Sequence, residues 1–250
     1  MSSVITFYDI PSKTPGQAWS PNTWKIRYAL NFKGIPYKTV WVEYPDIEKV
    51  SKKIGAPPTN EKPDGAPFYT LPAIYDPSTN TAVSESILIA EYLDKTYPDT
   101  PKLLPGDTHA LQRAATNAFL PGGGPGLQFA IPATHRILSS ASEGYFRRHR
   151  EPLFGKTLEE LTPTGPERDV EWAKVKARFN DVDKWLRGGE GPYFLGKTPS
   201  FIDFDVGARL YWYRTIFGED SAEYTDILSW NEGRWAVYAE GLKQYETVTV

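Results

Sequence analysis

The stretch Ala18-Trp19-Ser20-Pro21-Asn22-Thr23-Trp24-Lys25 decides how the rest of the chain is interpreted. Residues 4–8 before it are typical of a strand, and residues 20–33 have the pattern of a helix. Ser20 suits the N-cap, where a hydroxyl can accept a hydrogen bond from the first turn, and Pro21 suits the first helical position. The chain thus brings a hydroxyl and unpaired N–H donors to the positive end of a helix, where an anion can bind. A plain helix cap is the alternative interpretation of Ser20.

The composition of the chain excludes several classes of function. It has 250 residues, a net charge of −3 and no cysteine. A net negative charge argues against a basic surface that binds nucleic acid. The lack of cysteine excludes disulfides, thiolate metal sites and cysteine nucleophiles. Three histidines, His109, His135 and His149, are too scattered to predict a metal centre. We interpret the basic run 147–150 as solvated helix surface.

The first half of the chain alternates strand and helix patterns. After the helix at 20–33, residues 39–42 predict a second strand, parallel to the first. The remaining predicted elements are a helix at 46–54, a surface loop at 57–67, a strand at 68–76, a hairpin strand at 81–83 and a helix opened by 84–86. We therefore predict a four-stranded mixed sheet with helices on its faces. With no secretion signal and no apolar run that spans a bilayer, we expect a cytoplasmic protein without a membrane partner.

The second half has almost no strand signal. Helical patterns occupy residues 107–119, 128–150, 166–187, 200–217 and 235–244, and a Pro- and Gly-rich break interrupts them at 120–126. The run from 166 to 187 has one apolar face, which we expect to be buried: Trp172, Val175, Phe179, Val182, Trp185 and Leu186. A proline-punctuated linker at 98–106 separates the halves. We predict an α+β domain over residues 1–98 and an all-helical domain over residues 107–250.

Three motifs in this order are similar to those of the cytosolic glutathione transferases. Leu71-Pro72 opens the third main strand, Glu85-Ser86 opens the next helix, and Ser20 lies upstream. The resemblance covers the whole chain and includes the run 196–203, where Ser200 and Asp203 resemble the structural helix cap of the family's second domain. The local run 20–25 resembles the fungal serine-type class related to bacterial β-etherases.

The resemblance implies a thioredoxin-like first domain, a homodimer, glutathione as co-substrate and no metal. Ser20 would donate its hydroxyl to the glutathione sulfur. Leu71 would pair its backbone with the cysteinyl part beside a cis Pro72, and Glu85 and Ser86 would bind the γ-glutamyl end. Asn22 is either a second donor near the sulfur or a solvated first-turn residue. Tyr8 is the rival to Ser20, because some classes use a tyrosine near the end of the first strand.

The residues that bind the other substrate are less defined by sequence. Candidates are Tyr8, Trp19, the break at 120–128, and the aromatic run Tyr211-Trp212-Tyr213 with Phe217, although aromatics at helical spacing also form cores. The resemblance implies a hydrophobic, aromatic or lignin-derived electrophile, and leaves conjugation, ether cleavage and peroxide reduction open. One of Lys49, Lys52 and Lys53 could meet the glycyl carboxylate, or all three could be surface residues.

Two other functions fit the same fold. A carrier of aromatic ligands with little catalysis would use the same aromatic residues. A protein-interaction scaffold would not need the glutathione-contact positions, which this sequence keeps. Loss of activity in Ser20→Ala with ligand binding intact would distinguish an enzyme from a carrier.

Overall fold

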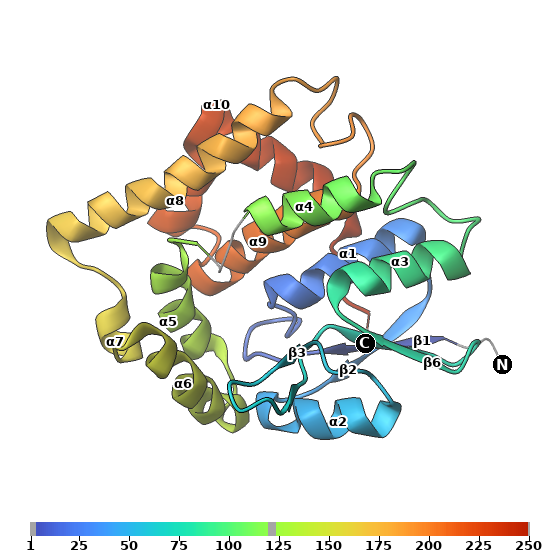
Figure 1. The fold of residues 1–250 in the computed structure, drawn as a ribbon. Coiled ribbons are helices and arrows are strands. Elements are labelled where there is room, and N and C mark those ends of the chain that lie inside the picture. The colour runs from blue at the N-terminus through green and yellow to red at the C-terminus, as the bar shows by residue number, and fades with distance from the viewer. Residues whose placement is uncertain (1–3, 120–123, 250) are drawn as a thin grey trace.

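A computed structural model describes residues 4–119 and 124–249. Figure 1 shows a sheet with helices on both faces, formed by the first half of the chain, and a larger group of helices formed by the second half. The central sheet contains β1 (Ile5–Asp9), β2 (Tyr37–Trp41), β5 (Ala73–Asp76) and β6 (Thr81–Ser84), in the order β2-β1-β5-β6. β1 and β2 are parallel and the other pairs are antiparallel, which confirms the predicted mixed sheet.

Helices cover both faces of this sheet. α1 (Pro21–Lys33) and α3 (Ser86–Thr96) lie on one face, and α2 (Ile47–Ile54), preceded by the short turn η1 (Tyr44–Asp46), lies on the other (Figure 1). α1 begins after Ser20 and ends at Gly34, whose φ of 64° closes the helix in the left-handed conformation that glycine adopts without a steric penalty. The start and the end of α1 are therefore as the sequence predicted.

The predicted strand at 68–76 is wrong in one respect, because it is two strands. β4 (Pro67–Phe68) pairs with β3 (Asn60–Glu61) in a separate two-stranded sheet, and β5 begins only at Ala73. The predicted loop at 57–67 thus contains a strand. Strands of two residues are too short to show an alternating pattern, so sequence periodicity could not reveal them. The Leu71–Pro72 peptide between β4 and β5 is cis, as the resemblance implied.

The second half is helical in its described parts. Its helices are α4 (His109–Phe119), α5 (Leu127–Ile137), α6 (Ser140–Phe154), α7 (Leu158–Leu161), α8 (Gly165–Leu186), α9 (Phe201–Phe217) and α10 (Ala222–Leu242), followed by η3 (Lys243–Tyr245). The run predicted at 128–150 is two helices, α5 and α6. Residues 120–123 of the predicted break lie outside the described residues.

Two further predictions about these helices need correction. α10 consists of two helical stretches separated by the non-helical residues 230–233; the second agrees with the helix predicted near Trp235, and the first, from Ala222, was not predicted. On α8 the predicted apolar face is buried, except that Trp185 is 45% exposed. The Ser200–Asp203 capping box at the start of α9 is present, as predicted.

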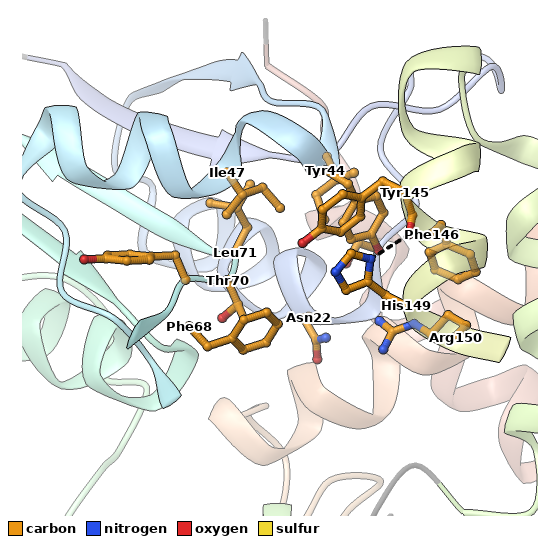
Figure 2. Close-up of a pocket in the computed structure, with 13 residues that line it drawn as sticks. Asn22, Tyr44, Ile47, Phe68, Thr70, Leu71, Tyr145, Phe146, His149 and Arg150 are labelled. Carbon is orange, nitrogen blue, oxygen red and sulfur yellow. Dashed lines mark hydrogen bonds between the residues drawn. The ribbon is translucent and has the colours of Figure 1, made fainter. Parts of the chain in front are cut away.

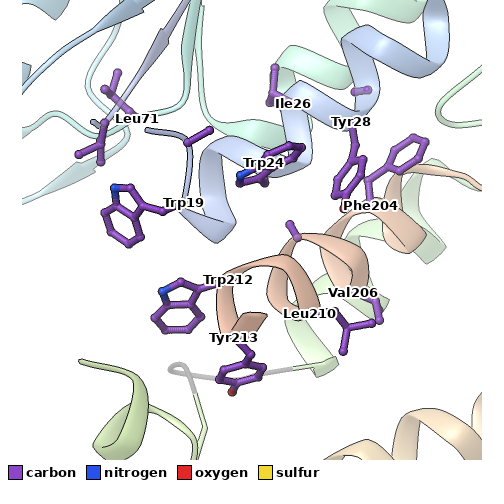
Figure 3. Close-up of a cluster of buried hydrophobic side chains, with 14 of the residues drawn as sticks. Trp19, Trp24, Ile26, Tyr28, Leu71, Phe204, Val206, Leu210, Trp212 and Tyr213 are labelled. Atoms are coloured by element: carbon purple, nitrogen blue, oxygen red, sulfur yellow. The ribbon is translucent and has the colours of Figure 1, made fainter. Parts of the chain in front are cut away.

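The two halves of the chain pack along α1 and α9 (Figure 3). Trp24 on α1 is fully buried, and the centroid of its ring lies 3.7 Å from the ring centroid of Tyr211. Tyr28 stacks on Phe204 with ring centroids 5.8 Å apart. α1 is therefore buried on both sides, against the sheet and against α9, and this fixes its first turn between the two domains.

The segment 245–249 crosses back to the sheet domain. The Asn31 side chain donates to the carbonyls of Tyr245 and Thr247, and the Thr39 hydroxyl donates to the carbonyl of Thr249. Thr39 also accepts from the buried Arg27, whose guanidinium pairs with Asp9 at 2.7 Å. The segment is thus joined to a buried charge network at the centre of the first domain. No helix in the described ranges is both long and apolar enough to cross a membrane.

Candidate functional site

Ser20 lies at the N-terminus of α1 but does not cap it with its side chain. Its backbone carbonyl accepts from Trp24 N–H at 2.9 Å and from the Thr23 hydroxyl at 3.1 Å. The structure describes the whole first turn of α1, and the Ser20 hydroxyl makes no cap hydrogen bond to it. The side chain is only 4% exposed and faces two cavities. The plain-cap interpretation of Ser20 is therefore not supported.

Two adjoining cavities lie between the sheet domain and the helical domain. The first, of about 140 Å³, lies between the loop at Leu71 and α6 (Figure 2). The second, of about 300 Å³, extends from the first turn of α1 toward α5, α6 and α9. Five residues line both cavities: Ser20, Asn22, Tyr44, Phe146 and Arg150. The two cavities thus meet at the start of α1, with Ser20 at the junction.

The structure brings some of the predicted site residues together at this junction. Ser20, Asn22 and Leu71 line the first cavity, and Trp19 lines the second. Pro72 and Glu85 do not appear among the described lining residues of either cavity. They directly flank the pair Ala73–Ser84, with which the β5–β6 ladder ends on the side of Leu71.

Glu85 adopts a conformation that the sequence did not suggest. Its φ is 76°, a left-handed value that is uncommon outside glycine. Its carboxylate accepts from the N–H groups of Ile87 and Leu88, both at 3.3 Å, and from the Ser86 hydroxyl at 3.3 Å. The N–H groups expected to face a ligand are therefore occupied by Glu85 itself, through long contacts that a ligand carboxylate could replace.

Tyr8 and Tyr211 do not line either cavity in the described part of the chain. Tyr8 is buried in β1 opposite Ala73, and burial raises the pKa of its hydroxyl. Tyr211 packs against Trp24 in the interface between the domains. The neighbouring Trp212 lines the second cavity instead, and its ring N–H donates to Thr134 at 3.0 Å.

Helix α6 supplies site residues that sequence reasoning missed. His149 and Arg150 line the first cavity, and Arg150 also lines the second. The interpretation of 147–150 as solvated surface is wrong for Arg150, which is half-buried, whereas His149 is exposed as predicted but borders the cavity. His149 stacks on Tyr145 with ring centroids 3.9 Å apart, and its Nδ1 lies 2.8 Å from the Tyr145 carbonyl (Figure 2). Phe146, His149 and Arg150 are three and four residues apart, which puts them on one helix face. That spacing was the available signal.

Tyr44 joins the two domains beside the cavities. Its ring stacks on Tyr145 at 5.9 Å and contacts Phe146 at 5.6 Å between centroids. Burial of its hydroxyl raises the pKa of Tyr44 to about 12, so it stays protonated at neutral pH.

None of the three predicted lysines is among the described lining residues of either cavity. Lys52 pairs with Glu48 at 2.7 Å and lies over the ring of Tyr69, which does line the first cavity. Within the described ranges, no group of three His, Cys, Asp or Glu side chains is placed to hold a metal ion.

Comparison with known proteins agrees with this architecture. Residues 19–96 match the model of the glutathione S-transferase N-terminal domain, and residues 110–245 match that of the C-terminal domain. A glutathione S-transferase-like protein of Aspergillus flavus, ustS, is 34% identical over 94% of this chain and 95% of that protein.

Solved structures agree over the whole fold. The glutathione S-transferase CsGST63524 of Ceriporiopsis subvermispora, solved in complex with glutathione, is 48% identical, with a TM-score of 0.93 over 98% of each chain. Glutathione transferase GSTFuA3 of Phanerochaete chrysosporium is 41% identical, with a TM-score of 0.91 over 99% of each chain. The thioredoxin-like first domain and helical second domain match these structures. This chain belongs to the glutathione S-transferase family.

Proposed function

We propose that this protein is a serine-type glutathione transferase in which Ser20 donates a hydrogen bond to the glutathione sulfur. The observation that carries the proposal is the position of Ser20, which lines both cavities at the start of α1. Glutathione would occupy the first cavity beside Leu71, Pro72, Glu85 and Ser86, with Asn22 as a second donor. Solved relatives that bind glutathione support this assignment.

The physical role of Ser20 is to favour thiolate over thiol. A hydroxyl donor and the positive end of a helix both stabilise a negative sulfur. Lowering a thiol pKa from about 8.5 to about 6.5 raises the thiolate fraction at pH 7 roughly 25-fold. A less basic thiolate is also a weaker nucleophile, which offsets roughly eightfold of this gain. Most of the rate must therefore come from holding the electrophile against the sulfur.

The second cavity supports an aromatic electrophile. Its walls include Trp19, Trp212, Phe146 and Phe154, which give large apolar contact surfaces to a flat ring. We propose phenolic or lignin-derived compounds as the substrate class and an etherase-like, cytoplasmic homodimer as the working form. Conjugation, ether cleavage and peroxide reduction all begin from the same activated thiol.

The test is Ser20→Ala, with the exposed Ser229→Ala as the control. Glutathione binding is measured by calorimetry and turnover with 1-chloro-2,4-dinitrobenzene. The two pKa values above predict a fall in kcat/KM at pH 7 between about 3-fold and 25-fold. The ratio of wild-type kcat/KM to Ser20→Ala kcat/KM should be roughly 20-fold smaller at pH 9 than at pH 7. At pH 9 the bound glutathione is mostly thiolate in both proteins, so Ser20 no longer changes the thiolate fraction much.

Three outcomes separate the alternatives. A pH-independent loss of activity would refute thiolate stabilisation by Ser20. Glutathione binding without turnover of any electrophile in a broad panel would favour the carrier. No binding of glutathione would refute the site itself and leave the scaffold.

A further inference from the structure

We propose that Arg150 is the anion-binding residue of the second cavity, and that the electrophile is an aromatic compound carrying a carboxylate. This inference rests on the proposed function, and it specifies the substrate class. Arg150 reaches the wall shared by both cavities from α6 (Figure 2). Its neighbour on the helix, Arg147, instead pairs with Glu151 and Glu159.

The charge of Arg150 is not neutralised by the part of the protein that the structure describes. None of the ion pairs among residues 4–119 and 124–249 includes Arg150, and its Nε is buried without a hydrogen-bond partner there. Its guanidinium lies over the Phe146 ring, 5.2 Å from the centroid, and reaches the hydroxyl of Tyr44. Both partners are neutral. A half-buried cation with only neutral partners favours an anionic ligand.

The opposite wall adds positive rather than negative charge. Arg209 lines the second cavity and lies 3.7 Å from Asp205, which also pairs with Lys25 at 3.1 Å. No Asp or Glu is among the described residues that line the second cavity. Its described lining combines aromatic and aliphatic side chains with two arginines, Arg150 and Arg209.

This combination suits an aromatic carboxylate better than a neutral aromatic. The planar guanidinium fork of arginine matches a carboxylate with two parallel N–H···O bonds, and such charge-assisted bonds are strong where water is excluded. The ring would pack against Trp19 and Trp212 while the carboxylate binds Arg150. The reactive carbon would then lie toward Ser20, at the junction where the sulfur is proposed to bind.

A pair of matched electrophiles tests this directly. 4-Chloro-3,5-dinitrobenzoate and its amide undergo the same substitution, in which a C–S bond forms, the C–Cl bond breaks, chloride leaves and the thiol proton passes to the buffer. Each kcat/KM is divided by the uncatalysed rate constant with glutathione, which removes the difference in intrinsic reactivity. We expect the wild type to favour the acid, and Arg150→Gln to lower the normalised acid-to-amide ratio about 10- to 100-fold, the effect of one charged hydrogen bond.

Two further variants separate charge from structure. Arg150→Lys keeps the positive charge but loses the two parallel N–H donors of the guanidinium, so its normalised acid-to-amide ratio should lie between those of the wild type and Arg150→Gln. Arg148→Gln removes a charge from an exposed position on the same helix and should leave the ratio unchanged. Calorimetric binding of both probes to each protein gives the same comparison where turnover is too slow to measure.

Opposite results would overturn the inference in distinguishable ways. A wild type that prefers the amide, or an Arg150→Gln ratio within twofold of the wild type, would refute the anion site while the transferase activity stands. Equal loss of the ratio in Arg148→Gln would show a general charge effect. Failure to bind glutathione would refute the proposed function instead.

Discussion

The two domains meet in two places that are built very differently. Along α1 and α9 the contact is deeply buried and largely aromatic: Trp24, Tyr28 and Phe204 are all at most 1% exposed, and one buried ion pair joins Lys25 to Asp205. Between η1 and α6 the contact borders the cavities, and it combines the packing of Tyr44 against α6 with polar contacts. There the Glu43 carboxylate accepts from the hydroxyls of Ser139 at 2.7 Å and Ser142 at 2.5 Å.

The difference separates stability from specificity. Burial of a large aromatic side chain contributes several kcal/mol, whereas one hydrogen bond contributes about 1 kcal/mol net, because the unfolded chain makes that bond to water instead. The α1–α9 contact therefore holds the domains together and fixes Ser20. The η1–α6 contact sets the position of the wall that carries Tyr145, Phe146 and Arg150, and it can change at small cost to the fold.

The largest effect is expected at Trp24. Trp24→Ala removes a fully buried ring that packs against Tyr28 and Tyr211, and should lower the free energy of unfolding by about 3–5 kcal/mol. Urea unfolding measures this. Trp185→Ala, at a position 45% exposed, is the matched control and should cost less than about 1 kcal/mol. Equal costs at the two positions would contradict the assignment of stability to the α1–α9 contact.

A middle-sized effect is expected from one substitution made in both regions. At Gly207 on α9 an added Cβ would lie 2.4 Å from a Leu242 methyl carbon and 3.5 Å from the Tyr28 ring, so Gly207→Ala should destabilise by about 1–3 kcal/mol. At Gly144 on α6 the nearest atom is the flexible end of Arg148 at 3.4 Å. Gly144→Ala should therefore stabilise by up to about 1 kcal/mol through helix propensity. Thermal unfolding of both variants measures whether each substitution raises or lowers stability. If both change stability in the same direction, the two regions do not differ in packing as described.

The smallest effect on stability is expected at the polar contact. Glu43→Gln and Ser142→Ala should each lower the free energy of unfolding by about 1 kcal/mol, with a coupling energy above about 0.5 kcal/mol in the double mutant. Because α6 lines both cavities, we expect both the KM for the electrophile and the affinity for glutathione to change. Additive stabilities together with an unchanged KM would show that Glu43 does not position α6.

The sequence predicted the features that depend on local rules. Pro21 and Gly34 mark the ends of α1 because backbone preferences act over one turn, and Ser20 occupies the N-cap position without a side-chain cap. The capping box at Ser200 and Asp203 could be found for the same reason.

The sequence could not predict features set by packing over long distances. Arg150 looks like any surface arginine until the fold places α6 against the start of α1. Tyr211 and Trp212 are adjacent and similar in chemistry, and only the rotation of α9 decides that Trp212 meets the cavity. Residues 222–229, before the kink at Asn231 and Glu232, form a helical stretch too short for periodicity in the sequence to reveal it.

The contact of residues 245–249 with the first domain has a consequence for the order of events during synthesis. The bonds from Asn31 and Thr39 join residues 214 and 210 positions apart. Domains usually fold as they leave the ribosome, with the N-terminal one first. Here the partners of α1 and β2 are synthesised only after the whole helical domain. A newly made first domain must therefore wait, incomplete on one side, until the second has been translated.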